Sequence, residues 1–523
     1  MKKNLNLINL YFFLTIFAFV INFWTGSRGV FEIDTFVHFD PAVNILDNIL
    51  PIRDLWIVHG LTVDLIQSIF FYFFGINWNA YLIHGSLFNA LITIVSFYFY
   101  LELDLTKFQA FIISLCISIL AYPVSATPFL DLHATFFSLI AIYLLILAIK
   151  REKNIYIYFS IILLGLAFFS KQVPTAYIIL FYTIFLIFYS SQIKKITPLI
   201  HSFISLVIFL LVLYIYLFIS GTKFSDFIFQ LFIFPIMFGS ERFSSYELNI
   251  KNTFWQFKFI YIFLLPLIYI YFQEITKKNS FKNKKFYYFI IILFFSLSLM
   301  YHQIFTKNQI FIFFLVPVLS GFLIYSINQF NLNKKKILVN LTIILCLLIT
   351  IKYHYRYNVD RKFHELSNVN LNKAISINFK KNFFNNLQWI SLNFKNPEKE
   401  IKIIKEFYLL LKSDPANKIL ITGHNYFSGL MGVKIYTPSR TYDDISYPKK
   451  NSYYYDIYKN HFKNYIKKHE IKNIYVFETS TVVNERPLNH LIFNYIPPSC
   501  FTKENISIYI NKLKIISCKE LKN

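Results

Sequence analysis

The sequence is poor in the residues that build soluble surfaces and loops. Only 15% of its 523 residues are charged, and it has just 12 glycines and 16 prolines, whereas 56% are hydrophobic and 20% are aromatic. Its apolar runs approach the roughly 20 residues that a helix needs to cross about 30 Å of hydrocarbon. A soluble domain could not bury so much apolar surface, so the composition predicts a polytopic membrane protein.

Acidic residues are also scarce. The chain has 28 Asp and Glu residues against 52 Lys and Arg residues, a formal net charge of +24. Much of the basic excess lies in short breaks between apolar runs, at 150–154, 191–195, 277–285 and 331–336. Lysines at such positions orient helices toward the cytoplasm. We therefore interpret the charge as a topology signal and expect no binding of nucleic acid.

The apolar runs predict about eleven membrane spans. They start near residues 6, 79, 108, 132, 154, 174, 197, 255, 286, 309 and 337. The first run follows two lysines but lacks an A-x-A-like cleavage site, which favours an uncleaved first helix with a cytoplasmic N-terminus. An odd number of spans then places the segment after residue 352 outside. This topology is that of a bacterial plasma (inner) membrane protein with a periplasmic C-terminal domain.

The segment 353–523 has the composition of a separate domain. "NKILITG" and "IKNIYVFETS" read as buried strands, and a helical apolar spacing precedes the second. This order predicts a small α/β unit whose sheet is at least partly parallel. We therefore divide the chain into a membrane domain, 1–352, with a first outer loop at 24–78, and an extracytoplasmic α/β domain, 353–523.

Cysteines and metal-binding motifs are few. Cys116 and Cys346 fall in apolar spans, where cysteine acts as a small hydrophobe. Cys500 and Cys518 lie in the polar tail, and both a disulfide and free thiols stay open for them. The outer loops lack H-x-x-x-H and Asp-x-Asp, so we expect no metal site and no cofactor, with a divalent cation left open. "TGHNYFSGLMG" lacks the G-x-G-x-x-G spacing of a dinucleotide site.

Polar chemistry gathers in the first outer loop, in "GVFEIDTFVHFDPAVNILDNILPIRDLWIVHGLTVD" (29–64). Asp34 lies close behind the first span, where an acid is costly unless it is partnered or used. His38 follows four residues later and shares its face if the segment is helical. Asp40 and Pro41 form a good helix start, in which Asp40 would cap free backbone N–H groups.

Four more polar side chains follow in the same loop, namely Arg53, Asp54, His59 and Asp64. Together the cluster offers an acid that can act as a base and several donors that can hold an anion. The alternative is a hydrogen-bond network that only orders the loop.

The loop resembles the first outer loop of the polytopic GT-C glycosyltransferases. The similarity lies in Asp34, in Ala42 eight residues later and in "ILDNILPIRDLWIVHG" (45–60). "LLGLAFFSKQVP" (163–174) is similar to a second family segment at the outer end of a middle span. The outer loop starting at His302 and the α/β tail extend the likeness, which is greatest to the protein O-mannosyltransferase and aminoarabinose transferase branches.

The resemblance implies an inverting transferase that takes one sugar from a polyprenyl-phosphate carrier. Such a reaction needs a base for the acceptor hydroxyl and positive charge near the departing phosphate. We assign the base to Asp34. Phosphate binding is assigned to Arg53, His59 and Lys171, with Lys307 and His302 in reserve; for Lys171 the alternative is a lysine extending to the membrane interface at a helix end.

Asp131 and His133, in "FLDLHAT", lie at the outer end of a predicted span. They either contact the acceptor or cap a helix, and we favour the cap.

The acceptor can be a lipid, a glycan or a protein. One rival function is a transporter of lipid-linked saccharides, which would show charged or Gly/Pro-interrupted segments near the membrane midplane of two related halves. The other is an O-antigen ligase or polymerase, whose large loop with arginine and histidine residues comes late in the chain.

Overall fold

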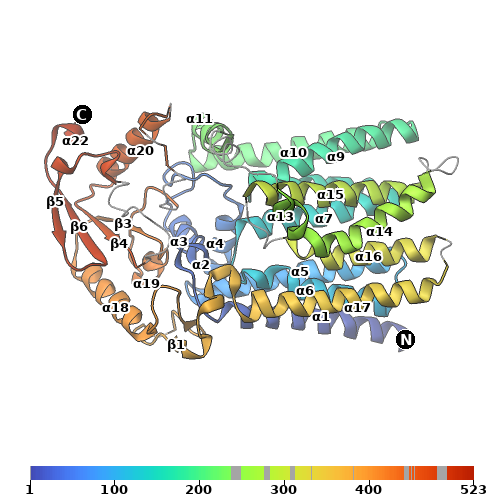
Figure 1. The fold of residues 1–523 in the computed structure, drawn as a ribbon. Helices are drawn as coiled ribbons and strands as arrows, with labels where there is room; N and C mark the ends of the chain where they lie inside the picture. Colours follow the sequence, from blue (N-terminus) through green and yellow to red (C-terminus); the bar gives the residue numbers. More distant parts are fainter. Residues whose placement is uncertain are drawn as a thin grey trace. The chain divides into compact units, whose positions relative to one another are not determined.

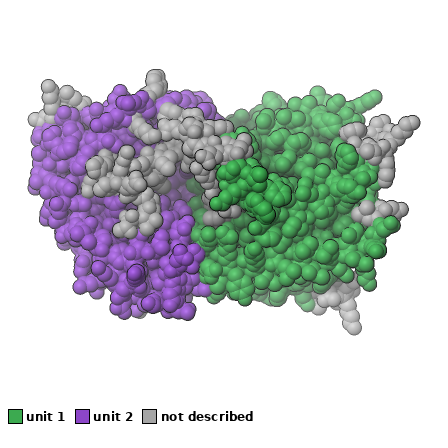
Figure 2. Space-filling model, in the orientation of Figure 1, with its two compact units in different colours: residues 1–26, 82–216, 242–363 green, residues 27–81, 217–241, 364–523 purple. Residues whose placement is uncertain are grey.

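The computed structural model describes residues 2–236, 249–275, 283–306, 312–330, 333–380, 382–440, 447–448, 450–452, 454–479 and 492–522. The chain forms two compact units, coloured separately in Figure 2. Unit 1 comprises Met1–Gly26, Leu82–Tyr216 and Arg242–Phe363, and unit 2 comprises Ser27–Tyr81, Leu217–Glu241 and His364–Asn523. The first outer loop, which the sequence grouped with the membrane domain, is therefore in the same unit as the C-terminal segment.

Nine helices in the described part of the chain are long and apolar enough to cross a membrane. They are built on α1 (Lys2–Gly26), α5 (Trp78–Glu102), α6 (Lys107–Leu120), α7 (Leu130–Arg151), α9 (Gln172–Ile193), α10 (Thr197–Ser220), α14 (Lys258–Ile275), α15 (Lys284–Thr306) and α17 (Lys335–Tyr353) (Figure 1). The spans predicted near 154 and 309 correspond to the shorter helices α8 (Ile155–Phe168) and α16 (Leu315–Gln329). The polytopic helical fold is confirmed, but the count of eleven spans is not.

The helices of unit 1 differ in how far they are buried. In α7, 94% of the apolar span is buried within the protein, and the helix contacts α8, α9 and α15. In α10 only 11% is buried. Both helices are apolar, but their surroundings differ. The apolar faces of α7 pack against other helices, whereas those of α10 are available to lipid.

Unit 2 contains a four-stranded mixed sheet of order β3-β4-β6-β5. Its strands are β3 (Lys418–Thr422), β4 (Asn473–Phe477), β5 (Phe501–Asn505) and β6 (Ile510–Ile515). β3 and β4 are parallel, and β6 is antiparallel to both β4 and β5. The two strands predicted from the sequence, and the parallel pairing between them, are confirmed.

Helices cover both faces of this sheet. The side chains of β4 alternate between the two faces, so each face presents apolar residues against which a helix can pack. Ile474 and Val476 pack into one apolar core with Phe462 of α20 (Tyr455–Lys468). On the other face, the ring of Phe477 stacks on Phe407 of α18 (Pro397–Ser413) at a centroid distance of 4.4 Å. Figure 1 shows α18 and α20 beside the sheet.

Short elements complete the two units. In unit 2 these are α2 (Glu32–Phe36), α3 (Phe39–Leu46), α4 (Thr62–Phe74), α11 (Phe224–Ile228), α19 (Phe427–Met431), α22 (Lys519–Lys522) and the paired strands β1 (Ile375–Ser376) and β2 (Gln388–Trp389), and in unit 1 α13 (Ile250–Thr253). Three of the helices, α2, α3 and α4, belong to the first outer loop.

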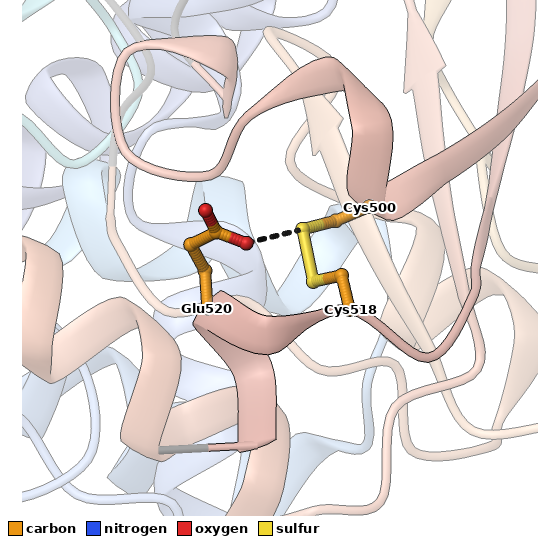
Figure 3. Close-up of a disulfide and its surroundings, with 3 residues drawn as sticks. All are labelled: Cys500, Cys518 and Glu520. Atoms are coloured by element: carbon orange, nitrogen blue, oxygen red, sulfur yellow. Dashed lines mark hydrogen bonds between the residues drawn. A yellow bond between two sulfur atoms is a disulfide. The ribbon is translucent and has the colours of Figure 1, made fainter.

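A disulfide closes the end of the tail. Cys500 and Cys518 are bonded, with their Cα atoms 5.2 Å apart, and Glu520 Oε2 lies 3.8 Å from Cys500 Sγ (Figure 3). Of the alternatives that the sequence left open for these two cysteines, the structure has the disulfide. Cys116 and Cys346 are free and buried, as expected for small apolar side chains.

Candidate active site

Asp34 lies on α2, a short helix of unit 2. Two neighbours on this helix are buried: Glu32 has 2% of its surface exposed and Phe36 none. The Phe36 ring contacts that of Tyr426 at a centroid distance of 4.5 Å. Asp34 itself is half-buried. The packing of its neighbours therefore holds this carboxyl group in a partly accessible position on a fixed helix.

His38 and Asp64 meet in the interior of unit 2. His38 Nδ1 lies 2.5 Å from Asp64 Oδ1, and both side chains are fully buried. Arg440 pairs with the second carboxylate oxygen of Asp64 and donates to the Gly60 carbonyl at 3.1 Å. The helical spacing considered between Asp34 and His38 is interrupted, because α2 ends before His38. Sequence reasoning missed Arg440 because it lies 376 residues from Asp64 along the chain.

Asp40 caps a helix, but not its own. The N-cap of α3 is His38, whose side chain makes no capping hydrogen bond. The Asp40 carboxylate instead accepts the backbone N–H groups of Ser428 at 3.0 Å and Gly429 at 3.1 Å, in α19. The predicted cap of its own helix is therefore wrong, because α19 presents free N–H groups to this side chain. Burial raises the pKa of Asp40 to about 7, although these N–H donors act in the opposite direction.

Arg53 and Asp54 form an ion pair with a third partner. Arg53 Nε donates to Asp54 Oδ2 at 2.7 Å, and Lys468 Nζ donates to Asp54 Oδ1 at 2.6 Å. The remaining guanidinium contacts are to the carbonyl oxygens of Ser220 and Asn48, at 2.9 and 2.6 Å. Burial by itself would raise the pKa of Asp54, but the hydrogen bonds from its two basic partners lower it.

His59 lies in the loop before α4 and is half-buried. The side chain of Gln230 makes two hydrogen bonds to the backbone of this loop. Its Oε1 accepts the Ile57 N–H at 3.1 Å, and its Nε2 donates to the Ile52 carbonyl at 3.0 Å. A glutamine from the 217–241 stretch thus fixes the backbone that carries both Arg53 and His59.

In unit 1, two predicted residues, Lys171 and His302, lie beside the carboxylate of a third, Asp131. Lys171 Nζ donates to Asp131 Oδ1 at 2.6 Å, and His302 Nε2 lies 3.6 Å from the same oxygen. The side chains are mostly buried, with 16%, 8% and 5% exposed for Lys171, Asp131 and His302. Asp131 is in the first turn of α7, but the N-cap is Phe129 and has no side-chain cap. The favoured helix-cap role of Asp131 is therefore wrong; its carboxylate pairs with Lys171 instead.

His133 is buried in a hydrogen-bonded group of its own. Its Nε2 lies 2.9 Å from His84 Nε2, and its Nδ1 lies 3.0 Å from the Tyr122 hydroxyl. Both ring nitrogens of His133 thus face a polar group of the same unit. Lys307, the reserve phosphate ligand, lies outside the described residues.

The predicted site residues in the described part of the chain therefore fall into several separate local groups. Those in unit 2 are Asp34 on α2, the buried His38 and Asp64 pair, Asp40 at the start of α19, the Arg53 and Asp54 pair, and His59 in the loop before α4. Those in unit 1 are the Asp131 cluster and the group around His133. Chemically, these groups offer a partly exposed carboxylate, a guanidinium and an ammonium group. These are the functional groups that a base and an anion site require.

Comparison with known proteins bears on this chemistry. Residues 58–215 match the model of the dolichyl-phosphate-mannose-protein mannosyltransferase family. The matched segment contains His59, Asp64, Asp131 and Lys171, but it begins after Asp34 and Arg53. No curated protein sequence matches the chain.

A solved structure extends the comparison to almost the whole chain. It is the crystal structure of ArnT from Cupriavidus metallidurans bound to undecaprenyl phosphate, with a TM-score of 0.52, 10% sequence identity and coverage of 98% of both chains. The two chains therefore share a fold along almost their whole length. The resemblance to the mannosyltransferase and aminoarabinose transferase branch is thus confirmed, and the family match indicates a glycosyltransferase of the class that uses lipid-linked donors.

Proposed function

We propose that this protein is an inverting glycosyltransferase that moves one sugar from a polyprenyl-phosphate carrier to an acceptor hydroxyl at the outer face of a bacterial plasma membrane. The observation that carries the proposal is the mannosyltransferase family match over residues 58–215. It is supported by a half-buried acid on a fixed helix of the first outer loop, and by the fold shared with ArnT.

Asp34 acts as the general base in this proposal. The acceptor oxygen attacks the anomeric carbon, its proton passes to the Asp34 carboxylate, and the bond from that carbon to the phosphate oxygen breaks. The electron pair leaves with the polyprenyl phosphate, which is a stable anion and needs little general acid. A positioned base contributes on the order of 10² to 10⁴ in rate.

Lys171, Arg53 and His59 bind the donor phosphate. An ammonium group carries three N–H donors, and Asp131 accepts one from Lys171. The carboxylate holds the lysine in place while its other N–H groups can reach a phosphate oxygen. Arg53 has a planar guanidinium suited to phosphate, but its contacts to Asp54, Ser220 and Asn48 must partly open for it to bind.

The disulfide supports an outer location for unit 2. Bonds such as Cys500–Cys518 form and persist in oxidising compartments outside the cytoplasm. The basic breaks at 150–154 and 191–195 agree with this topology, since such lysine clusters favour the cytoplasmic side. The acceptor, which the residues do not specify, is a lipid, a glycan or a protein.

The test uses purified full-length protein with a panel of polyprenyl-phosphate sugars and measures release of polyprenyl phosphate. We expect wild type to release the carrier with at least one donor, and Asp34→Asn to lose on the order of 10² to 10⁴ in rate, as for loss of a general base.

The matched control is Asp47→Asn, which removes an exposed acid of the same loop and should keep wild-type activity. In the same assay, Lys171→Gln should weaken the apparent affinity for the donor. Unchanged activity in Asp34→Asn would refute the assignment of the base, and absence of release with every donor would refute the proposed reaction.

A further inference from the structure

Unit 2 contains a cluster of three buried side chains that the proposed reaction does not use. Glu32 comes from α2, Glu400 from α18, and His424 from the turn after β3. Their exposed fractions are 2%, 0% and 1%. One potential ligand atom from each lies within 4.8 Å of the other two. Sequence reasoning missed this cluster because Glu32 lies more than 360 residues before the other two members and the three match no spacing motif.

The two carboxyl groups of the cluster are only half satisfied by hydrogen bonds. Glu400 Oε2 accepts from Trp389 Nε1 at 2.9 Å and from Ser391 Oγ at 2.8 Å. Glu32 Oε1 accepts from Asn393 Nδ2 at 2.9 Å. The second oxygen of each group, Oε2 of Glu32 and Oε1 of Glu400, is buried, and among the described residues it has no donor except the other glutamate when that group is protonated.

Two buried carboxylates side by side require a positive charge or a shared proton. Burial, and then the charge of Glu32, raise the pKa of Glu400 to about 8. None of the ion pairs in the described chain joins a lysine or arginine to either glutamate. A bound divalent cation would supply the charge that the described side chains around the two glutamates do not.

The third member of the cluster is in the state in which histidine binds metals. Burial lowers the pKa of His424 to about 3, so its imidazole is neutral. Its Nε2 lies 2.7 Å from Thr479 Oγ1, and its Nδ1 lies 3.3 Å from the Tyr426 hydroxyl. The nitrogen that binds an ion gives up its hydroxyl partner, and the hydroxyl at the other nitrogen accepts its N–H and orients the ring.

We propose that Glu32, Glu400 and His424 bind one divalent transition-metal ion, through the two unpaired carboxylate oxygens and one imidazole nitrogen. Mixed oxygen and nitrogen ligands suit zinc or manganese, whereas magnesium and calcium prefer oxygen alone. The ion neutralises the two carboxylates and joins α2 of the first outer loop to α18 and the turn after β3. Its role is structural, and it takes no part in the transfer reaction.

This site would also position the helix that carries Asp34. Glu32 precedes Asp34 by two residues on α2, so a ligand bond at Glu32 restrains the backbone on which that carboxylate stands. The metal site does not depend on the proposed function, because metal content and stability report it without any assay of sugar transfer.

The experiment measures metal in full-length protein that is purified without an affinity tag for metals. Elemental analysis by mass spectrometry should find about one zinc or manganese ion per chain in wild type, as a closed protein site holds its ion through purification. After removal of metal with a chelator, addition of Zn²⁺ or Mn²⁺ should raise the unfolding temperature.

Two variants make the result specific. Glu400→Gln keeps the shape of the side chain and its acceptor oxygen but removes the charge, and should reduce the bound metal to less than about a tenth of an ion per chain. Glu398→Gln changes an exposed acid in the first turn of the same helix and should bind metal like wild type.

Several outcomes would overturn the proposal. Wild type without stoichiometric metal, and with no thermal shift on addition of Zn²⁺ or Mn²⁺, would mean that the two glutamates share a proton instead. Metal retained in full by Glu400→Gln would place the ion elsewhere. If Glu400→Gln fails to fold, the metal content and thermal shift of wild type decide the question.

Discussion

Unit 1 buries one acid among its described residues, Asp131, whereas unit 2 buries five: Glu32, Asp40, Asp54, Asp64 and Glu400. The two units also compensate these charges differently. Asp131 lies beside Lys171 and His302, so its carboxylate has two basic partners. An acid at a membrane-spanning helix is expensive unless a partner neutralises it, and the buried acid described in unit 1 meets that condition.

Unit 2 uses three arrangements for its five acids. Asp54 and Asp64 have basic partners, like Asp131. Asp40 accepts backbone N–H groups at the start of a helix, and Glu32 and Glu400 lie beside one another. Three buried acids of unit 2 thus have no cationic side chain beside them in the described structure. The loss of stability on mutating a buried acid or its partner should therefore depend on how that acid is compensated.

The largest effect is expected in unit 1. Asp131→Asn leaves Lys171 without its carboxylate and should lower the free energy of unfolding by about 3 kcal/mol, as when one partner of a buried ion pair is removed. Thermal unfolding in detergent measures the change. The double variant with Lys171→Gln should recover most of it.

The matched control for this test is Asp104→Asn, which breaks the exposed pair with Lys150 in the same unit and should cost less than about 1 kcal/mol. If Asp131→Asn is as stable as this control, the buried acid of unit 1 does not need its basic partners, and the contrast between the units disappears.

An intermediate, pH-dependent effect is expected at Asp40. Its pKa of about 7 in the folded protein lies above its ordinary value of 3.8. The folded state therefore holds the proton where the unfolded state has lost it, and this group's contribution to stability falls as the pH rises from about 4 to about 7. Asp40→Asn removes that loss.

The measurement compares unfolding of Asp40→Asn and wild type at pH 5 and pH 8. Between pH 5 and pH 8, the free energy of unfolding of the variant relative to that of wild type should rise by more than about 1 kcal/mol. One pKa unit corresponds to about 1.4 kcal/mol. Asp47→Asn, at an exposed acid following the same helix, should show no such movement. A difference for Asp40→Asn that is independent of pH would contradict the raised pKa.

The smallest effect is expected where the basic partner is exposed. Lys468 has 59% of its side chain exposed, although its partner Asp54 has only 3% exposed. Lys468→Gln should cost less than about 1 kcal/mol, since solvent screens the lysine and Arg53 still pairs with Asp54. Its neighbour Lys467→Gln serves as control, and a loss of several kcal/mol specific to Lys468 would show that screening is overestimated here.

The sequence predicted the parts of this protein that depend on local pattern. Long apolar runs marked the helices that match membrane spans, since a bilayer requires that composition wherever the chain crosses it. The alternation between buried strands and an amphipathic helix marked β3, α20 and β4. Motifs of the first outer loop and of the segment around Lys171 indicated the family branch, which the family match and the fold then confirmed.

Pairings between distant residues were beyond the sequence. Asp40 looked like the cap of its own helix because Pro41 follows it, yet it caps α19, nearly 400 residues along the chain. Arg440 and Asp64 could not be joined from sequence for the same reason. The same holds for Asp131, whose Lys171 partner comes from another helix of the bundle.

The sequence by itself therefore determined the membrane architecture, the α/β character of the tail and the resemblance to a family of glycosyltransferases. These follow from composition and short-range periodicity, which act within one element. Only the tertiary structure decided how each buried charge is compensated, which cysteines are bonded and which acids share a site with His424. Those outcomes depend on contacts between elements far apart in the chain, where burial leaves a polar group no partner but the one that folding brings to it.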